Sequence, residues 1–548
     1  MKNKLITPDL TLYRAMKKVT AEYPQRSAVT YGDQTLTYTE LSEQVDGLAQ
    51  GLRNLGVKAG DKIATILPNS LETVYSFFAP SALGAVIVPL NPLYRQREFS
   101  HILADSEASI VIAEPNYMGN DIQGILESLR PSLPHLEHVI LRGDAPSGNI
   151  SLSDLDRTGS PLPSESVLPN DLCALVYTSG TTGMPKAVMH SHTSMLSAVS
   201  QSEDKINVPI LQKLWDFLRL LIKYDTRYIR YGFKQFSFFV PAPMHTLIGY
   251  AGLIYGLLLG HRYIVVDRFH PGKILELVEK ERISALSLTP TMMAAVLNSP
   301  EIKRRDLSSL LYVSMGAAPV PPDLVKRARE AFGCPILIAF GTTEVGGVTL
   351  ATDALGDSED LQSTTVGRLV SGMEAKVVDD QRHEVPQDEV GELALRLPTK
   401  MLGYYKAPEM TAEVLDSEGW YYTGDLATLD AKGYVRIVGR KKDMIIRGGQ
   451  NIYPAEIENY LMSHPEIQMV AVVGVPDSLA GERVWAFVML RDGATLTSGD
   501  VLQYAREGLA PYKVPEQVRI VQELPMTSTN KIRKIDLIQM IKDEGLSS

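Results

Sequence analysis

The stretch YTSGTTGMPK, residues 177–186, has the composition of a loop that binds phosphate. It follows an apolar strand pattern, and its glycines expose backbone N–H groups beside several hydroxyls, a combination that can hold several phosphate oxygens. The groups concerned belong to Thr178, Ser179, Gly180, Thr181, Thr182 and Gly183, and Lys186 ends the loop. In a P-loop the lysine comes directly after the last glycine, whereas Met184 and Pro185 intervene here. A polar turn after a buried strand is the alternative interpretation.

Three later stretches carry charged groups that suit the remainder of a nucleotide. FGTTE, residues 340–344, ends a strand pattern with Glu344, and Mg²⁺ prefers one or two carboxylates together with phosphate oxygens. YYTGD places Asp425 after a tight glycine turn, where its carboxylate can accept both hydroxyls of a ribose. GRKKD supplies Arg440, which can help to hold the same sugar or the phosphates. Together these residues predict a site for a nucleotide and Mg²⁺.

On these motifs the sequence resembles the adenylate-forming superfamily, which contains acyl-CoA synthetases, adenylation domains of peptide synthetases and firefly luciferase. The resemblance extends from TYTEL to NKIRK, and YTSGTTGMPK, FGTTE, GELALR, YYTGD and GRKKDMIIRGG occur in the family's order. It implies that a carboxylate attacks the α-phosphate of ATP, that pyrophosphate leaves, and that an acyl-adenylate remains. The acyl group then passes to the thiol of coenzyme A and AMP departs. ATP, Mg²⁺ and coenzyme A are the implied cofactors.

The resemblance also implies roles for single lysines. Lys186 is expected to steady the leaving β and γ phosphates as a loop lysine, without being the main catalyst. The expected catalyst is Lys531, whose ammonium would bridge the substrate carboxylate and the α-phosphate and stabilise charge that develops in the transition state. Most relatives have Gly where this chain has Asn530, a residue that also tolerates left-handed backbone angles.

Further family positions concern domain rotation and the nucleotide base. Lys442 matches a hinge about which the small domain rotates after adenylation, so that Gly448 and Gly449 approach the substrate tunnel and let a pantetheine arm pass. VSMGAAPV, residues 313–320, matches the strand and turn that contact adenine and the acyl group. The remaining positions expected at the nucleotide are Gly316, Ala317, Ala318, Pro319, Phe340, Gly341, Thr342 and Thr343.

The nature of the acid is indicated by the stretch FVPAPMHTLIGY. Amino-acid-activating relatives usually carry an Asp here to pair with the substrate ammonium, but this chain has His245 and Thr246, which disfavours an α-amino acid. His245 matches a residue that packs near the substrate carboxylate and gates the pocket. The following helix pattern, LIGYAGLIYGLLLG, can line a hydrophobic slot. The prediction is an apolar acid, either aliphatic or aryl.

Two other classes of function remain open on the sequence. The acyl group could be loaded onto the phosphopantetheine of a carrier protein in place of free coenzyme A. Alternatively, the chain could be a nucleotide-binding relative without catalysis, although the joint presence of Lys531, Glu344, Asp425 and Arg440 argues against this class.

Two kinds of sequence pattern predict the elements that must position these residues. A Thr cap with Glu three residues on predicts an amphipathic helix over 36–55, and short β-branched segments such as KIATIL, AVIVPL and SIVIAE alternate with helical patterns such as 70–83. This alternation predicts a parallel sheet covered by helices, and it recurs from RYIVVD to PILIAFG as a second sheet. After about residue 365 the pattern becomes that of an antiparallel module.

The sequence therefore predicts an α/β fold with two domains. The large N-terminal domain, 1–441, would contain two wound sheets and the antiparallel β module, and would bind ATP and the acid. The small α+β C-terminal domain, 442–548, would be mobile and carry the catalytic lysine. The boundary is placed at the charged, glycine-containing joint GRKKDMIIRGG.

Composition limits the partners and the compartment. The 54 basic and 64 acidic side chains give a net charge of −10, which opposes binding to nucleic acid. The two cysteines, Cys173 and Cys334, lie in apolar segments and indicate buried thiols in a reducing compartment. No apolar run of secretory length follows the first residues, and the apolar stretch 246–260 is shorter than the ~20 residues of a bilayer-crossing helix. A cytoplasmic protein is expected.

One segment, residues 208–234, has the pattern of a basic amphipathic helix. Apolar residues recur at helical spacing, and Lys213, Arg219, Lys223, Arg227 and Arg230 occupy the remainder. Such a helix can lie peripherally on a membrane or cover an apolar substrate entrance. A surface helix packed on its own domain is the alternative.

Overall fold

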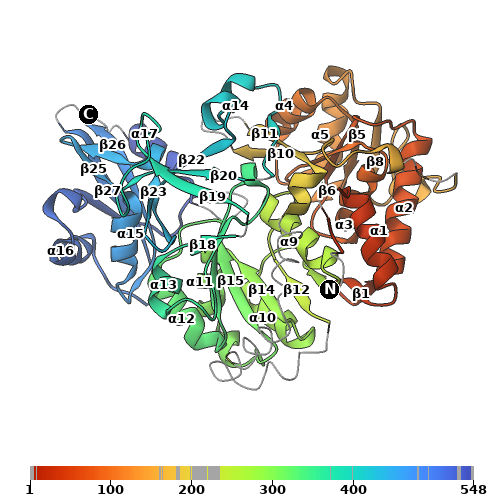
Figure 1. Ribbon diagram of the computed structural model, residues 1–548. Coiled ribbons are helices and arrows are strands. Elements are labelled where there is room, and N and C mark those ends of the chain that lie inside the picture. The colour runs from red at the N-terminus through yellow and green to blue at the C-terminus, as the bar shows by residue number, and fades with distance from the viewer. Residues whose placement is uncertain are drawn as a thin grey trace.

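The computed structural model describes residues 5–544 other than 8, 160, 161, 163, 180–184, 198, 200–218, 220–234, 371, 398, 478, 479, 492 and 527–531. Within that part of the chain, two wound α/β sheets come first, an antiparallel sheet follows, and a smaller unit of helices and strands ends the chain (Figure 1). This is the predicted fold class. The predicted amphipathic segment 208–234 lies outside the described residues, apart from Arg219.

The first wound sheet is built mainly from the amino-terminal part of the chain, red to yellow in Figure 1. Its spatial order over the described residues is β21 (Gly403–Tyr404), β11 (Pro185–Ser191), β10 (Leu172–Ser179), β4 (Val86–Pro89), β3 (Lys62–Ile66), β5 (Ala108–Ala113), β8 (His138–Leu141) and β9 (Ile150–Ser151). The strands from β10 to β9 run parallel. Their central members are buried on both faces, as their continuous apolar sequences predict.

The second wound sheet is formed mostly by residues 237–369. Its spatial order over the described residues is β18 (Arg368–Leu369), β17 (Leu350–Ala351), β16 (Ile336–Phe340), β15 (Tyr312–Gly316), β14 (Ala285–Leu288), β12 (Ser237–Phe239), β13 (Arg262–Val265), β1 (Ser27–Tyr31) and β2 (Gln34–Thr37). The strands from β16 to β1 are parallel. Because the carboxyl ends of parallel strands meet at one edge, the sheet gathers the residues that follow β15 and β16.

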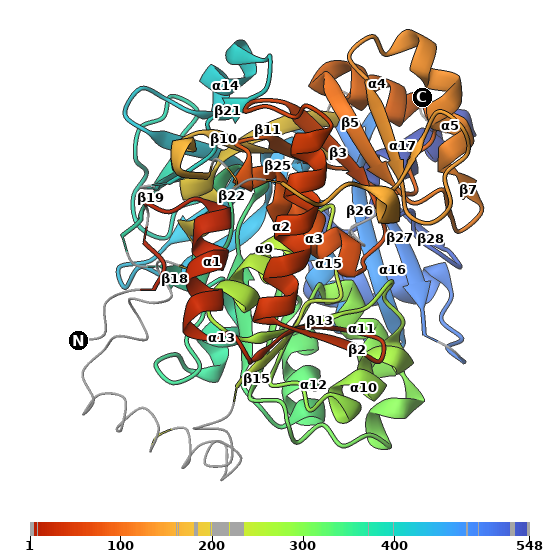
Figure 2. The ribbon, with the colours of Figure 1, turned by 90° about the vertical axis from the view of Figure 1, so that its right-hand side faces the viewer.

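Helices cover both faces of each sheet and also fill the space between them. The outer layers are α4 (Gln96–Ser106) and α5 (Ile122–Leu129) on the first sheet, and α10 (Pro271–Lys280), α11 (Pro290–Asn298) and α12 (Pro322–Phe332) on the second. The middle layer is α1 (Leu12–Glu22), α2 (Tyr38–Asn54), α3 (Leu71–Phe78) and α9 (Leu247–Leu258). Apolar residues of this layer share one core with the inner faces of both sheets, and Figure 2 shows α1 and α2 side by side in it.

The antiparallel module and the C-terminal unit follow along the chain. The antiparallel sheet has, in the described residues, the order β19 (Glu374–Val378), β20 (Gly391–Arg396), β22 (Trp420–Leu429) and β23 (Val435–Arg440). The C-terminal unit, blue in Figure 1, has β25 (Gln450–Ile452), β24 (Ile445–Arg447), β27 (Gly481–Leu490), β26 (Ile467–Asp477) and β28 (Gln517–Ile520) with α15 (Pro454–Met462), α16 (Ser498–Gly508) and α17 (Lys534–Asp543). Smaller elements are β6 (Asn116–Tyr117), β7 (Asn120–Asp121), α13 (Glu359–Thr364) and α14 (Pro408–Val414).

Several local predictions are confirmed by the structure. Thr37 caps α2, and Glu40 returns the hydrogen bond as in a capping box. The apolar stretch 246–260 forms α9, whose residues belong to the middle core layer. Among the described helices, none combines the length and the apolar content needed to cross a bilayer. Cys173 and Cys334 are both buried free thiols.

Candidate active site

The stretch predicted to bind phosphate begins at the end of β10, in the first wound sheet. Lys186, near the start of β11, lies opposite Thr178 in the antiparallel β10–β11 ladder, so the two residues flank the loop at its base. Residues 180–184 lie outside the described part of the chain, and of Ser179 only the strand position is described. The structure therefore brings the two ends of the predicted loop together beside β21.

A second row of predicted residues follows two neighbouring strands of the second sheet. β15 ends at Gly316, which is paired with Ala339 of β16, so the segments after both strands begin at one edge. Ala317 has a φ of 67°, a left-handed conformation that residues other than glycine rarely adopt and that marks a strained turn. The residues that keep accessible surface along this edge are Ala317, Ala318, Pro319, Phe340, Gly341, Thr342, Thr343 and Glu344.

Tyr404 connects the two rows. The ammonium of Lys186 lies 3.8 Å from the centroid of the Tyr404 ring, and the Tyr404 hydroxyl donates a hydrogen bond of 2.8 Å to Oε1 of Glu344. Burial lowers the pKa of Lys186, and the carboxylates of Glu344 and Glu413 partly oppose that shift. A lysine and a carboxylate from different sheets are thus held by one phenol.

Asp425 and Arg440 form the third part of the site, on the antiparallel module. They face each other across the β22–β23 ladder, and the Nε of Arg440 lies 2.8 Å from Oδ1 of Asp425. Asp425 is buried, whereas 48% of the Arg440 side chain is exposed. Burial alone would lower the pKa of Arg440, but the charge of Asp425, with smaller contributions from Tyr421 and Glu344, raises it. The guanidinium therefore remains a fixed positive charge beside the edge of β16.

The donors present suit a Mg²⁺ ion that arrives with phosphate. Within the described residues, no three carboxylate, imidazole or thiol groups converge into a cation cage. Glu344 offers a single carboxylate whose Oε1 is occupied by Tyr404, which leaves Oε2 for a cation. Mg²⁺ is typically bound by one or two carboxylates together with substrate phosphates and water, so this arrangement fits a Mg²⁺–nucleotide and does not fit a free metal site.

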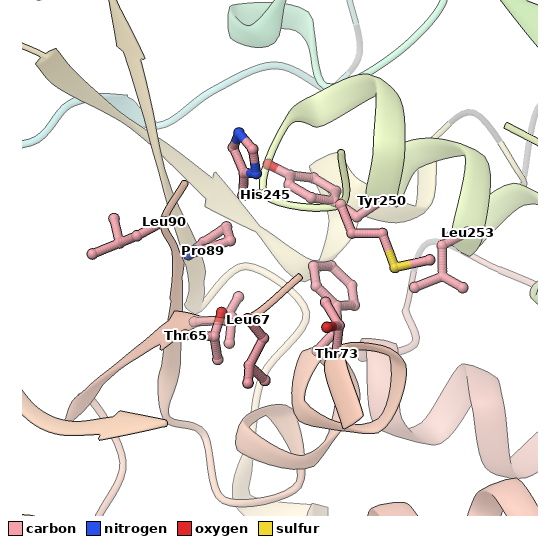
Figure 3. A pocket seen from close by; sticks show the side chains of 11 residues that line it. Thr65, Leu67, Thr73, Pro89, Leu90, His245, Tyr250 and Leu253 are labelled. Carbon is pink, nitrogen blue, oxygen red and sulfur yellow. The ribbon is translucent and has the colours of Figure 1, made fainter. Parts of the chain in front are cut away.

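An apolar pocket lies at the carboxyl ends of β3 and β4, where the two strands face α3 and α9 (Figure 3). Its lining residues are Thr65, Leu67, Thr73, Phe77, Ile87, Pro89, Leu90, Met244, His245, Tyr250 and Leu253. Burial lowers the pKa of His245 to about 3, so the imidazole is neutral near pH 7. Its Nε2 is buried and has no hydrogen-bond partner in the described part of the chain. None of the lining side chains therefore carries a charge at neutral pH.

The position of His245 depends on a close approach at the start of α9. Thr246 caps this helix, its hydroxyl accepting the N–H of Gly249. A Cβ on Gly249 would lie 2.2 Å from the carbonyl oxygen of Pro243 and 2.8 Å from Cα of Met244. The segment before His245 can lie against the helix only because residue 249 lacks a side chain.

The predicted hinge residue, Lys442, lies between two sheets. A single 3₁₀ turn, Lys441–Asp443, separates β23 of the antiparallel module from β24 of the C-terminal unit. Its Lys442 is close enough to Lys186 for the two charges to interact, which lowers the pKa of Lys186 further. Gly448 and Gly449 have φ angles of 57° and 77°, so both occupy the left-handed region that favours glycine. Lys531 lies outside the described residues.

Comparison with known proteins decides the family. A family model described as AMP-binding enzyme matches residues 16–405, and one described as AMP-binding enzyme C-terminal domain matches residues 456–531. This chain belongs to the AMP-binding enzyme family.

Relatives and solved structures agree with this assignment over nearly the whole chain. A feruloyl-CoA synthase of Amycolatopsis sp is 35% identical over 93% of this chain and 95% of its own length. The human mitochondrial medium-chain acyl-CoA ligase ACSF2 is 30% identical over 97% and 88%. The crystal structure of the anthranilate CoA ligase AuaEII with anthranoyl-AMP has a TM-score of 0.86, with 26% identity over 99% of this chain and 100% of that chain.

The geometry of this AMP-binding enzyme also reveals site residues that sequence reasoning missed. Tyr404 belongs to the stretch LGYYK, and Tyr421 belongs to YYTGD, in which the sequence pattern indicates the aspartate alone. Tyr421 is buried near Glu344 and Asp425, and burial is the main cause of its raised pKa. A tyrosine pair after GELALR was the only available signal, because the partner of Tyr404 lies 60 residues away in the sequence.

Proposed function

We propose that this protein is an ATP-dependent ligase that activates an apolar carboxylic acid, aliphatic or aryl, and transfers its acyl group to coenzyme A. Its family and its relatives support the two steps, formation of acyl-AMP and formation of the thioester. One observation carries the proposal for this chain: groups suited to a nucleotide, on Lys186, Glu344, Asp425 and Arg440, lie together. The uncharged apolar pocket that contains His245 supports the kind of acid proposed.

At the nucleotide end, each group has a role that its surroundings suit. The carboxylate of Asp425 accepts the hydroxyls of the ribose, and the neighbouring guanidinium of Arg440 holds the sugar or the phosphates. Lys186 places a positive charge beside the leaving phosphates. The turn after β15 and the edge 340–343 receive adenine, and Glu344 holds the Mg²⁺ that accompanies the phosphates and neutralises their charge.

At the acid end, the lining of the pocket disfavours an acid that carries a second charged group besides its carboxylate. A buried charge without an opposite charge beside it is costly. None of the eleven lining residues is charged at neutral pH, so the pocket offers no partner for a buried charge. The stretch in which amino-acid-activating relatives usually carry an Asp has His245 and Thr246 here, and Thr246 caps α9. An acid with an apolar body therefore suits this site, and the names of the relatives, one aryl and one medium-chain, support both kinds.

The catalytic lysine and the domain rotation remain part of the proposal. Lys531 would approach the α-phosphate for adenylation and withdraw when the C-terminal domain, 442–548, turns about Lys442. On either side of this segment, Met526 and Ile532 form an antiparallel bridge and the N–H of Arg533 donates to the carbonyl of Pro525. The chain thus enters and leaves the segment that carries Lys531 at one fixed point of the C-terminal unit.

The experiment that tests the proposal is a panel of carboxylic acids assayed for AMP release with ATP, Mg²⁺ and coenzyme A. We expect AMP and a thioester with medium-chain aliphatic or aryl acids, and neither product with α-amino acids or short dicarboxylic acids. AMP release that requires a carrier protein in place of coenzyme A would reassign the acceptor. Absence of AMP release with every acid would contradict the proposal.

A further inference from the structure

Tyr404 makes two contacts whose combination is not required for packing. It is 4% exposed and lies in the apolar cluster beneath the antiparallel module. Its ring supports the ammonium of Lys186 at 3.8 Å, and its hydroxyl donates to Oε1 of Glu344 at 2.8 Å. One rigid side chain thus fixes a cation from the phosphate loop relative to an anion at the edge of β16.

The backbone around Tyr404 is itself held to both partners. β21 pairs with β11, the strand that carries Lys186, with Tyr404 opposite Val188. The N–H of Tyr404 donates to the hydroxyl of Thr411 at 2.9 Å, and the N–H of Met401 donates to the carbonyl of Glu344 at 2.8 Å. The segment 401–404 therefore holds Glu344 through both its main chain and its side chain.

The two contacts restrict the conformations of two charged side chains that would otherwise be flexible. A lysine has four rotatable side-chain bonds and a glutamate three, so each can reach several positions unless something restricts it. Direct pairing of the two would leave neither free for a phosphate or a cation. The phenol prevents this, since its proton orients one carboxylate oxygen while the electron-rich ring face attracts the ammonium.

Protonation of the phenol supports the same arrangement. Burial, and then the charge of Glu344, raise the pKa of Tyr404 well above its ordinary value. The direction of the hydrogen bond, from the Tyr404 hydroxyl to Oε1 of Glu344, agrees with a protonated phenol.

We propose that Tyr404 is a positioning residue that sets Glu344 and Lys186 at a fixed separation, so that both meet the triphosphate and its Mg²⁺ as one preorganised unit. The identity of this ligand rests on the proposed function. Tyr404 does not line the apolar pocket, and its contribution passes through the other two residues.

The test compares two substitutions with a matched control. Tyr404→Phe keeps the ring beneath Lys186 and removes only the hydrogen bond to Glu344, whereas Tyr404→Leu removes both contacts. The control is Tyr434→Phe, because the Tyr434 hydroxyl donates to buried Asp357 at 2.6 Å in the same large domain, away from the nucleotide groups. Affinity for ATP is measured by calorimetry with Mg²⁺ and with EDTA, and kcat and KM by AMP release.

We expect Tyr404→Phe to weaken ATP binding about tenfold with Mg²⁺, from loss of a hydrogen bond to a charged group, and less than twofold in EDTA. Its kcat should fall by a similar factor. Tyr404→Leu should weaken binding under both conditions, because Lys186 loses its support as well. Tyr434→Phe should lower the unfolding midpoint without changing the Mg²⁺ dependence. The proposal would be overturned if Tyr404→Phe showed the same Mg²⁺ dependence of ATP binding and the same kcat as Tyr434→Phe.

A double-mutant cycle distinguishes an effect that passes through Glu344 from a loss of activity through misfolding. If Tyr404 acts through Glu344, then Tyr404→Phe should have less than a twofold effect on Mg²⁺-dependent ATP binding once Glu344→Ala is present. Additive effects would contradict the positioning role. Failure of the proposed function would look different, since the wild-type protein itself would then release no AMP with any acid.

Discussion

His192 provides a test of the structure through pH. It is fully buried after β11, its Nδ1 accepts the N–H of Leu12 at the start of α1 at 3.3 Å, and its Nε2 has no hydrogen-bond partner among the described residues. Protonation would break the bond to α1 and leave a buried charge. Burial accordingly lowers the pKa of His192 to about 4, from 6.5.

The sign and size of the effect follow from linkage. Because the unfolded chain binds a proton at His192 more tightly than the folded one, stability is full above pH 6.5 and is lost as the pH falls toward 4. At pH 5 the loss is ~2 kcal/mol for one such residue. His190 is also fully buried with a pKa lowered by burial to about 4, which doubles the loss. Burial also lowers the pKa of His245 to about 3 and of His261 to about 4, which adds comparable losses, so the total at pH 5 falls within ordinary domain stability, ~5–15 kcal/mol.

The assay is urea denaturation at pH 7.5 and pH 5.0 for the wild type, His192→Asn and a control. The asparagine oxygen can still accept the Leu12 N–H but does not titrate, so this variant should lose ~2 kcal/mol less than the wild type between the two pH values. His383→Asn is the matched control, because 79% of the His383 side chain is exposed, and it should follow the wild type. Equal losses for His192→Asn and the wild type would refute the reasoning.

Two further predictions concern the site. Gly249→Ala should destabilise the fold by ~1–3 kcal/mol through overpacking and raise the KM for the acid severalfold by displacing His245. Gly272→Ala lies in α10 and its new Cβ would be 3.6 Å from the nearest atom, so it should neither destabilise the fold nor change the KM. Lys531→Ala should slow adenylation by ~10²-fold or more while sparing thioester formation from supplied acyl-AMP. Gly449→Leu should slow thioester formation and spare adenylation. If single-turnover kinetics showed that each variant damages both steps equally, the proposed rotation of the C-terminal domain between the two steps would be contradicted.

Local rules predicted the elements well, and they failed where a long-range contact or a single proline decided the outcome. The capping box of Thr37 and Glu40 is a property of four consecutive residues, so the sequence alone predicts it. The helix expected over 70–83 ends as α3 at Phe78 and continues as a 3₁₀ turn over Ala79–Ala82. Pro80 explains this change, because it has no N–H to donate to a helical carbonyl.

The site residues likewise divide into those that local motifs predict and those that depend on long-range contacts. Asp425 and Arg440 could be predicted because each belongs to a short motif, and the ladder of β22 and β23 makes them neighbours. The part played by Tyr404 could not, since it depends on the pairing of β21 with β11 and on a glutamate from the other wound sheet. Likewise, nothing in the sequence near His192 indicates its bond to α1, 180 residues away.

The central claim is that ATP and an apolar acid form an acyl-adenylate at the groups gathered around Glu344 and Asp425. Exchange of labelled pyrophosphate into ATP without coenzyme A measures this step directly. We predict exchange that depends on an aliphatic or aryl acid and on Mg²⁺, is absent without acid, and is strongly reduced in Asp425→Asn. A folded protein that binds ATP but shows no exchange with any such acid, or exchanges only with amino acids, would contradict the account.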